Sequence, residues 1–372
     1  MLGSTPSQVP SVAFNDLRRA ASAQAEELTR AARRVIESGW FVHGSEHGRF
    51  ETDFASYLGV EHIMGVASGT DALELAMRAV ATSDRRTIVT VANAGAYTTC
   101  AALAAGLEVT FADIDPVDHL MSIDSLRPLL NERICAVVVT HLYGRLADTV
   151  DVRRLCEPLG ITVIEDCAQS AGARSEHGMG GAIGHLSTFS FYPTKNLGAL
   201  GDGGAIATSD PALANRVRQL RQYGWTRKYS NAIPGGRNSR LDEIQAAFLN
   251  QRLPLLDAGN ERRRAVIGRY ADSATANVRV LPADGPHHAG HLAVVETADA
   301  SRLAEHLRSY GVATEVHYPV PDHQQPFIAK GAVLPVTETK VGRILSLPCF
   351  PELTDDEIAR VCEALSHYQS KE

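Results

Sequence analysis

The stretch FSFYPTKNLGALGDGGAI, residues 189–206, decides the interpretation of this chain because it joins two expected strands through a turn that carries a lysine. The strands are expected at 188–191 and 204–208, where short apolar runs border the turn. Glycines in the turn would let the backbone approach a ligand closely. Lys195 among apolar neighbours would have a lowered pKa and could attack a carbonyl, whereas most turn lysines are simply solvated.

Strand and helix patterns alternate through the region before this turn. Further strands are expected at 87–91, 107–111, 134–140 and 161–165, and helical periods occupy 71–81, 98–105 and 150–159. The alternation predicts an α/β fold with a largely parallel sheet covered by helices. Ligands of such sheets bind at the carboxyl ends of the strands, so the chemistry is expected just past Glu165 and Phe191.

The C-terminal third indicates a second, smaller α/β unit. Helical patterns at 239–256 and 260–270 lead out of the large unit, and strands at 278–281, 291–296 and 314–317 and helices at 301–310 and 355–367 follow. We expect an N-terminal arm over 1–14, a large domain over 15–255 and a small C-terminal domain over 256–372.

The bulk composition excludes several classes of protein. A net charge of -7 over 372 residues gives no broad basic surface for nucleic acid or anionic membrane. No leader-like start and no apolar run of about 18 residues is present in the sequence, so a cytoplasmic protein without a membrane partner is expected. The six cysteines form no Cys-x-x-Cys pair and are expected to be reduced core residues.

A small-residue segment, Ser68-Gly69-Thr70, stands directly before an amphipathic helical run. Free backbone N–H groups and the helix dipole favour an anion at such a helix start, so the segment could hold a phosphate. A simple N-cap by Ser68 or Thr70 is the alternative.

Two acids, Glu165 and Asp166, end the apolar strand of 161–165, and Gln169 follows them. A carboxylate at that position could bind a protonated heterocyclic nitrogen. A metal-binding or capping role for the acid is equally open at this point.

An anion cradle, an acid at a strand end and a lysine in a close turn are together the parts of a pyridoxal phosphate site. With these motifs in place, the chain resembles the DegT/DnrJ/EryC1/StrS family of sugar aminotransferases from about Leu17 to the C-terminal helix. The motifs that carry the resemblance are ESGWFVHGSEHGRFE, VASGTDALELAM, HLYGRLADTV, IEDCAQSAGA, FSFYPTKNLGALGDGGAI, GGRNSRLDEIQAAFLNQRL and LSLPCFPELT.

The resemblance implies a fold of the aspartate-aminotransferase type (fold type I), with a mostly parallel sheet, and a homodimer with shared active sites. It implies that Lys195 forms the covalent link to pyridoxal 5'-phosphate, which becomes pyridoxamine phosphate during turnover. Asp166 would bind the ring nitrogen, and Gln169 the phenolic oxygen or the ring face. The phosphate would be held by Gly69, Thr70, Ser190 and, from the partner chain, Asn238.

Lysine at position 195 argues for transamination, because relatives that remove a sugar hydroxyl carry histidine there. One departure from the family concerns the aromatic residue that stacks on the cofactor ring. Gly95 stands at its expected position, so Tyr97 is the candidate for stacking instead.

The segments GDGGAI, QYGWTRKYSN and EVHYPVPDHQQPF most resemble enzymes that aminate carbon 3 of thymidine-diphosphate-linked 3-keto-6-deoxyhexoses, with glutamate as the implied donor. By that resemblance the sugar or nucleotide pocket would be lined by Tyr223, Lys228, Tyr229, His317 and His323, and the diphosphate would meet Arg237 or Arg240. The alternative for each is a surface or interface role.

Other functions remain open beside this one. Amination at carbon 4 and amination of a keto-cyclitol would use the same cofactor apparatus. A non-catalytic relative of the fold is less favoured because both Lys195 and Asp166 are present. The histidines of 286–291 are interpreted as the approach to a strand, and no metal is expected, because no acidic partner or i, i+4 histidine pair accompanies them.

Overall fold

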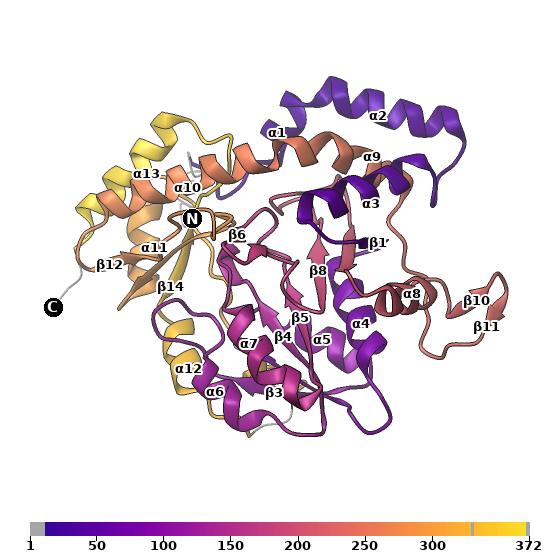
Figure 1. The fold of residues 1–372 in the computed structure, drawn as a ribbon. Coiled ribbons are helices and arrows are strands. Elements are labelled where there is room, and N and C mark those ends of the chain that lie inside the picture. The colour runs from indigo at the N-terminus through magenta and orange to yellow at the C-terminus, as the bar shows by residue number, and fades with distance from the viewer. Residues whose placement is uncertain (1–11, 329–330, 370–372) are drawn as a thin grey trace, which may run out of the picture.

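The computed structural model describes residues 12–328 and 331–369, and a seven-stranded sheet forms its centre (Figure 1). The strands lie in the order β1-β9-β8-β5-β4-β2-β3. Their bounds are β1 His62–Val66, β2 Thr87–Val91, β3 Glu108–Ala112, β4 Ile134–Thr140, β5 Thr162–Asp166, β8 Leu186–Ser190 and β9 Gly204–Thr208. The six strands expected here are all present, with small shifts at their ends.

The sheet is parallel from β3 through β8 and antiparallel at its other edge. β9 pairs antiparallel with β8 and with β1, because the turn that carries Lys195 reverses the chain between β8 and β9. The expected, largely parallel sheet is thus confirmed, and the edge formed by β9 and β1 is antiparallel. β1 is a strand that the sequence pattern did not indicate, and it pairs with β9 from His62 to Val66.

Alternating residues of the central strands pack against helices on both faces of the sheet. Ile88 shares a core with Leu75 of α4, whereas its neighbour Val89 shares another with Val152 of α7. The helices that accompany the sheet are α4 Gly69–Val80, α5 Tyr97–Ala104, α6 Ile123–Leu126, α7 Thr149–Cys156 and α8 Pro211–Leu220.

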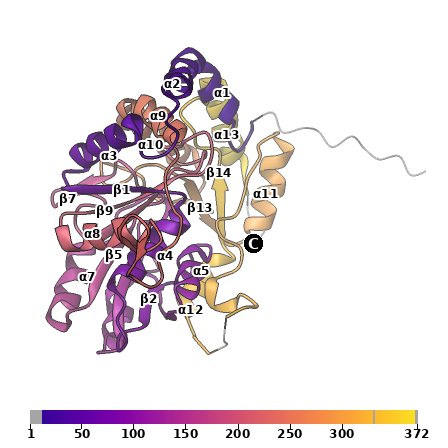
Figure 2. The same ribbon diagram turned by 90° about the vertical axis from the view of Figure 1, so that its right-hand side faces the viewer.

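Three further helices, α2 (Ala25–Ser38), α3 (Ser45–Leu58) and α9 (Glu243–Arg252), pack together beside β1 (Figure 2). Phe54 of α3 meets Phe189 of β8 edge to face at 5.0 Å. This aromatic contact packs α3 against the end of β8, just before the turn that carries Lys195.

The small unit contains an antiparallel sheet in the order β12-β13-β14. Its elements are β12 Val278–Val280, β13 Ala293–Thr297, β14 Ile344–Leu347, α10 Leu256–Ser273, α11 Ala300–Ser309 and α13 Asp355–His367. The strand expected at 314–317 is wrong, since that segment makes only one bridge, from Glu315 to Ser346, and β14 takes its place in the sheet. The proposed domain division at 255 and 256 coincides with the start of α10 and remains a prediction.

Smaller elements complete the described chain. They are α1 Leu17–Ala23, α12 Pro335–Val341, β6 Arg174–Ser175, β7 Gly178–Met179, β10 Trp225–Arg227 and β11 Ser230–Asn231. The β10–β11 hairpin projects from the body of the molecule beyond α8 (Figure 1). Of the helices in residues 12–328 and 331–369, none is both long and apolar enough to cross a membrane.

Candidate active site

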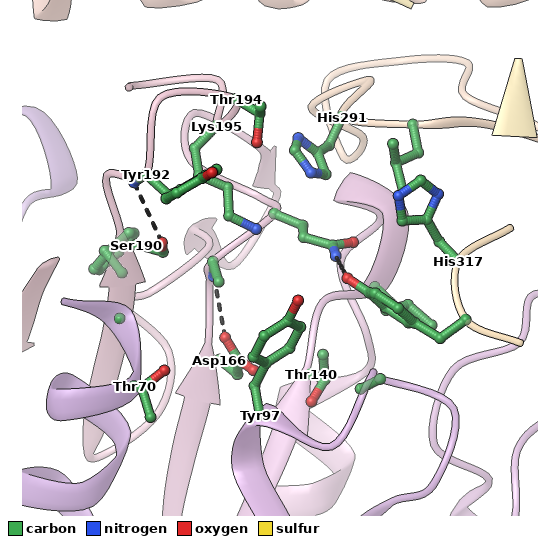
Figure 3. A pocket seen from close by; sticks show the side chains of 18 of the residues that line it. Thr70, Tyr97, Thr140, Asp166, Ser190, Tyr192, Thr194, Lys195, His291 and His317 are labelled. Atoms are coloured by element: carbon green, nitrogen blue, oxygen red, sulfur yellow. Dashed lines mark hydrogen bonds between the residues drawn. The ribbon is translucent and has the colours of Figure 1, made fainter. Parts of the chain in front are cut away.

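A cavity of about 580 Å³, here called the central cavity, opens where the carboxyl ends of β4, β5 and β8 meet the small unit. Thr140, Asp166 and Ser190 line it from these strand ends, and His291 and His317 from the small unit (Figure 3). The residues predicted from sequence that line this cavity are Gly69, Thr70, Tyr97, Asp166, Gln169, Ser190, Lys195 and His317.

Lys195 reaches into the cavity from the turn after β8 (Figure 3). Its backbone N–H donates to the Tyr192 carbonyl at 2.8 Å, which closes the turn. Burial lowers the pKa of the Lys195 amine, and the charge of Asp166 partly opposes this shift. Of the two interpretations of this lysine, the structure therefore favours the reactive amine over a solvated turn residue.

Asp166 lies at the end of β5 with only 6% of its surface exposed. Its carboxylate accepts hydrogen bonds from the Ala168 N–H at 3.1 Å and from Thr98 Oγ1 at 3.5 Å. Burial raises the pKa of Asp166. In the part of the chain that the structure describes, no lysine, arginine or histidine forms an ion pair with this carboxylate, so it can accept a protonated ring nitrogen that enters the cavity.

The anion cradle is built where α4 begins. Ser68 is the N-cap, because its Oγ accepts a hydrogen bond from the Asp71 N–H at 3.1 Å. The N–H groups of the first turn point away from the helix and need an outside acceptor. A Cβ at Gly69 would come within 2.6 Å of the Ser190 Cβ. The glycine thus lets α4 approach β8 closely, and the Ser68 N-cap is compatible with the anion-binding role expected for this helix start.

Gln169 is held on two sides at the opposite end of the cavity. Its Oε1 accepts from the Tyr143 N–H at 2.6 Å, and its Nε2 donates to the Tyr318 hydroxyl at 3.0 Å. The Tyr318 ring also fills the space beside Gly95, where a Cβ would lie 2.9 Å from that ring. Tyr97 meets Tyr318 edge to face at 5.9 Å. Tyr318 is a cavity residue that the sequence interpretation missed, although it directly follows His317.

His291 is a second cavity residue that was missed, because the pattern around it indicated only a strand. Asn196 donates to Asn260 Oδ1 at 2.7 Å and to the Ala289 carbonyl at 2.9 Å, so its own Oδ1 must accept from His291 Nδ1 at 2.7 Å. Burial, with the charge of Lys195, lowers the pKa of His291 well below its usual value. The ring is therefore neutral, with Nδ1 protonated and Nε2 free to accept.

Five residues expected at the substrate do not line the central cavity of their own chain, namely Tyr223, Lys228, Tyr229, Arg237 and Arg240. Asn238, expected at the cofactor phosphate of the partner chain, does not line the cavity of its own chain either. Arg237 forms ion pairs with Asp71 and Glu74. Ser239 anchors this segment, because its Oγ donates to Asp71 at 2.6 Å and accepts from the Ala67 N–H at 3.1 Å.

The expectation for His323 needs correction. This side chain is buried away from the central cavity, and its Nε2 lies 3.0 Å from Glu338 Oε1. Its ring lies beside Phe111 of β3. His323 therefore helps to attach the segment before α12 to the edge of the large sheet.

Glu165 has different hydrogen-bond partners from its neighbour Asp166. Its carboxylate accepts from His141 at 2.9 Å and from the N–H groups of Gly181, Ile183 and Gly184 at 3.1, 2.9 and 2.6 Å. Glu165, His141 and Cys167 lie close enough together to hold a metal ion. These hydrogen bonds already occupy the carboxylate, so a capping role for Glu165 accounts for the cluster.

A lysine in the turn after a strand, a buried acid on the neighbouring strand and a helix N-terminus for a phosphate are the features of a fold type I enzyme that uses pyridoxal phosphate. The model of the DegT/DnrJ/EryC1/StrS aminotransferase family matches residues 22–366, and the chain belongs to this family. It is thus a pyridoxal-phosphate-dependent sugar aminotransferase.

Characterised relatives cover nearly the whole chain. The dTDP-3-amino-3,4,6-trideoxy-alpha-D-glucose transaminase of Micromonospora megalomicea is 38% identical over 91% of this chain and 94% of its own length. The UDP-N-acetyl-3-dehydro-alpha-D-glucosamine 3-aminotransferase of Acidithiobacillus ferrooxidans is 35% identical over 94% of this chain and 96% of its own length. The crystal structure of Streptomyces venezuelae DesV in complex with a ketimine intermediate matches with a TM-score of 0.91 and 36% identity, covering 96% of this chain and 98% of DesV.

Proposed function

We propose that the chain transfers an amino group from glutamate to carbon 3 of a thymidine-diphosphate-linked 3-keto-6-deoxyhexose. The observation that carries the proposal is the meeting of Lys195, Asp166 and the start of α4 in one cavity. Its finer part, the sugar, is supported by the 38% identity to a transaminase named for a dTDP-3-amino sugar.

The protein groups have distinct tasks in this reaction. Pyridoxal phosphate, when bound, supplies the electron sink for the reacting carbon. Asp166 holds the ring nitrogen protonated, and the first turn of α4 with Ser190 holds the phosphate. The Lys195 Nζ would carry the proton between the cofactor carbon and the sugar carbon. An amine whose pKa is lowered by burial is suited to this task.

The sugar and the carbon are tested by direct assay. The purified protein would be incubated with glutamate and one keto acceptor in each of four parallel reactions. The acceptors are TDP-3-keto-6-deoxyhexose, its 4-keto isomer, a UDP-linked 3-keto sugar and a keto-cyclitol. We expect 2-oxoglutarate and an amino sugar, identified by mass and NMR, with the first acceptor at the highest kcat/KM. A higher value for the 4-keto sugar or the cyclitol would replace the proposed acceptor with that compound.

We also propose that the active enzyme is a homodimer in which segment 223–240 of one chain completes the site of the other. This segment lies outside its own central cavity, its β10–β11 hairpin projects from the molecule (Figure 1), and Tyr229 is 77% exposed. Trp40 and Phe41 are also exposed, and they stand beside the 242–243 backbone. Such apolar exposure is typical of an interface.

Shared sites can be tested by complementation. In a refolded mixture of Lys195→Ala and Asn238→Ala chains, each mixed dimer would hold one site with both native residues. The mixture should then recover about a quarter of the native activity, since half of the dimers are mixed. If the activity of the mixture equals the mean of the two single variants, Asn238 acts within its own chain.

A further inference from the structure

Arg263 of α10 is a buried cation in the wall of the central cavity. Only 7% of its surface is exposed, and it lines the cavity together with Cys349. Its Nη1 donates to the Cys349 carbonyl. In residues 12–328 and 331–369, no carboxylate lies within ion-pair distance of this guanidinium, while Arg262 beside it is paired with Asp355. A buried guanidinium without an anion is costly unless the anion arrives with a ligand.

The cavity offers few other positive charges to an anionic ligand. Among the lining residues that the structure describes, the lysines and arginines are Lys195 and Arg263. The histidines do not add charge near neutral pH, because burial lowers the pKa of His317 to about 4 and lowers that of His291 well below its usual value. Since Lys195 is the reacting amine, Arg263 is the fixed cation of this chain's cavity.

The chain packs closely around the base of the Arg263 side chain. A Cβ at Gly290 would lie 2.8 Å from the Arg263 Cβ, so glycine there allows the segment before β13 to pack directly against the arginine. His291 follows, and the charge of Arg263 helps to lower the pKa of its ring. Arg263 therefore lies near His291, on the small-unit side of the cavity, whereas the anion cradle belongs to α4 of the large domain.

We propose that Arg263 binds a carboxylate of the amino donor, an acidic amino acid, and of the 2-oxo acid left after transfer. The proposal rests on the proposed function for the existence of such a donor. A guanidinium presents paired N–H groups that match the two oxygens of a carboxylate, and the low exposure of Arg263 strengthens that attraction. The free donor groups of Arg263, beyond the one bound to Cys349, would make this contact.

The test separates donor binding from sugar binding. Holoenzymes of the native protein, Arg263→Gln, Arg263→Lys and the control Arg262→Gln would be titrated with L-glutamate and with 2-oxoglutarate while the cofactor absorbance is followed. Arg262→Gln removes the neighbouring arginine of the same helix, which is already paired with Asp355. We expect Arg263→Gln to raise the apparent Kd for both compounds on the order of 100-fold. The Kd values of Arg263→Lys should lie between those of the native protein and those of Arg263→Gln. The Kd values of the control Arg262→Gln should change less than about twofold. The KM for the sugar should also change less than about twofold in the Arg263 variants.

Several outcomes would overturn the inference. Unchanged glutamate affinity in Arg263→Gln would do so, as would a rise in the KM of the sugar alone, which would assign Arg263 to the sugar nucleotide. If both Arg263 variants fail to fold, a crystal structure of the native holoenzyme with 2-oxoglutarate decides, through the presence or absence of a carboxylate within hydrogen-bond distance of Arg263. Failure of native holoenzyme to respond to glutamate at all would instead contradict the proposed donor.

Discussion

Asp166 and Lys195 face the same cavity from neighbouring parts of the sheet without forming an ion pair, although the charge of Asp166 reaches the Lys195 amine. The separation matters because each group has a different partner in the proposed reaction. A direct salt bridge would hold the lysine protonated and would neutralise the acid needed at the ring nitrogen. Burial instead lowers the pKa of the Lys195 amine and keeps it reactive, and the lack of an ion pair leaves the Asp166 side chain available.

The role of Asp166 is tested by Asp166→Asn. The amide keeps the shape of the side chain and loses the negative charge, so the ring nitrogen would no longer be held protonated. We expect kcat to fall on the order of 100-fold while the cofactor still binds. Stopped-flow measurement of the glutamate half-reaction reports this directly. If the half-reaction of Asp166→Asn proceeds at the native rate, Asp166 has no role in the chemical step.

The anion cradle is tested by Gly69→Ala. The new Cβ would meet the Ser190 Cβ at 2.6 Å, so α4 and β8 must move apart at the proposed phosphate site. We expect cofactor affinity, measured by equilibrium dialysis, to fall at least about tenfold, with a loss of stability of about 1–3 kcal/mol. Gly48→Ala is the matched control, because nothing lies within 4 Å of a Cβ there. Equal behaviour of the two variants would contradict the cradle.

The contact between Gln169 and Tyr318 is tested by Tyr318→Phe. The change removes the acceptor of the Gln169 Nε2 and leaves the contact of its Oε1 with Tyr143 in place. The loss of one hydrogen bond of about 1 kcal/mol should weaken cofactor binding about fivefold, seen in the same dialysis assay. Tyr97→Phe keeps the aromatic ring and should bind cofactor normally. If Tyr318→Phe also binds normally, Gln169 does not depend on Tyr318 for its position.

Short-range pattern was sufficient for every strand of the large sheet except β1, and for the site residues that follow these strands. Asp166, Ser190 and Lys195 follow strands whose β-branched runs are clear in the sequence, so their meeting at one edge follows from the parallel order. The spacing of Gly69 before an amphipathic run likewise indicated the start of α4.

Contacts made by distant segments were out of reach of the same reasoning. Tyr318 and His291 reach the cavity from the small unit, across tertiary contacts that no local period reports. His323 was expected in the substrate pocket from its sequence context, and its side chain instead forms a hydrogen bond with Glu338. The 314–317 run is rich in strand-forming residues, yet β14 pairs with β13 in its place, because tertiary packing decides between competing strands.

Asp322 gives a prediction about pH. Its buried carboxylate accepts from the Ala96 N–H at 2.8 Å and from Thr99 Oγ1 at 2.5 Å, and thereby joins the 318–325 segment to the start of α5. Burial raises the pKa of Asp322 to about 6, above its ordinary value of 3.8. The folded state thus binds this proton more tightly than the unfolded state, so the contribution of Asp322 to stability decreases as the pH rises from about 4 to about 6.

Urea unfolding of the native protein and of Asp322→Asn between pH 4 and pH 8 measures this effect. Because other acids also titrate, the informative quantity is the difference between the two proteins. The native protein should lose stability relative to Asp322→Asn as the pH rises, by up to about 3 kcal/mol, and the difference should level off above about pH 7. A difference that does not change with pH would show that Asp322 has an ordinary pKa.

The most direct test of the account is the absorbance spectrum of the purified protein with pyridoxal phosphate, before and after glutamate, for the native chain and for Lys195→Ala. We predict a visible band in the native protein that requires Lys195 and is replaced by the pyridoxamine phosphate band when glutamate is added. A native protein that shows no Lys195-dependent band would contradict the assignment of Lys195 as the residue that holds the cofactor.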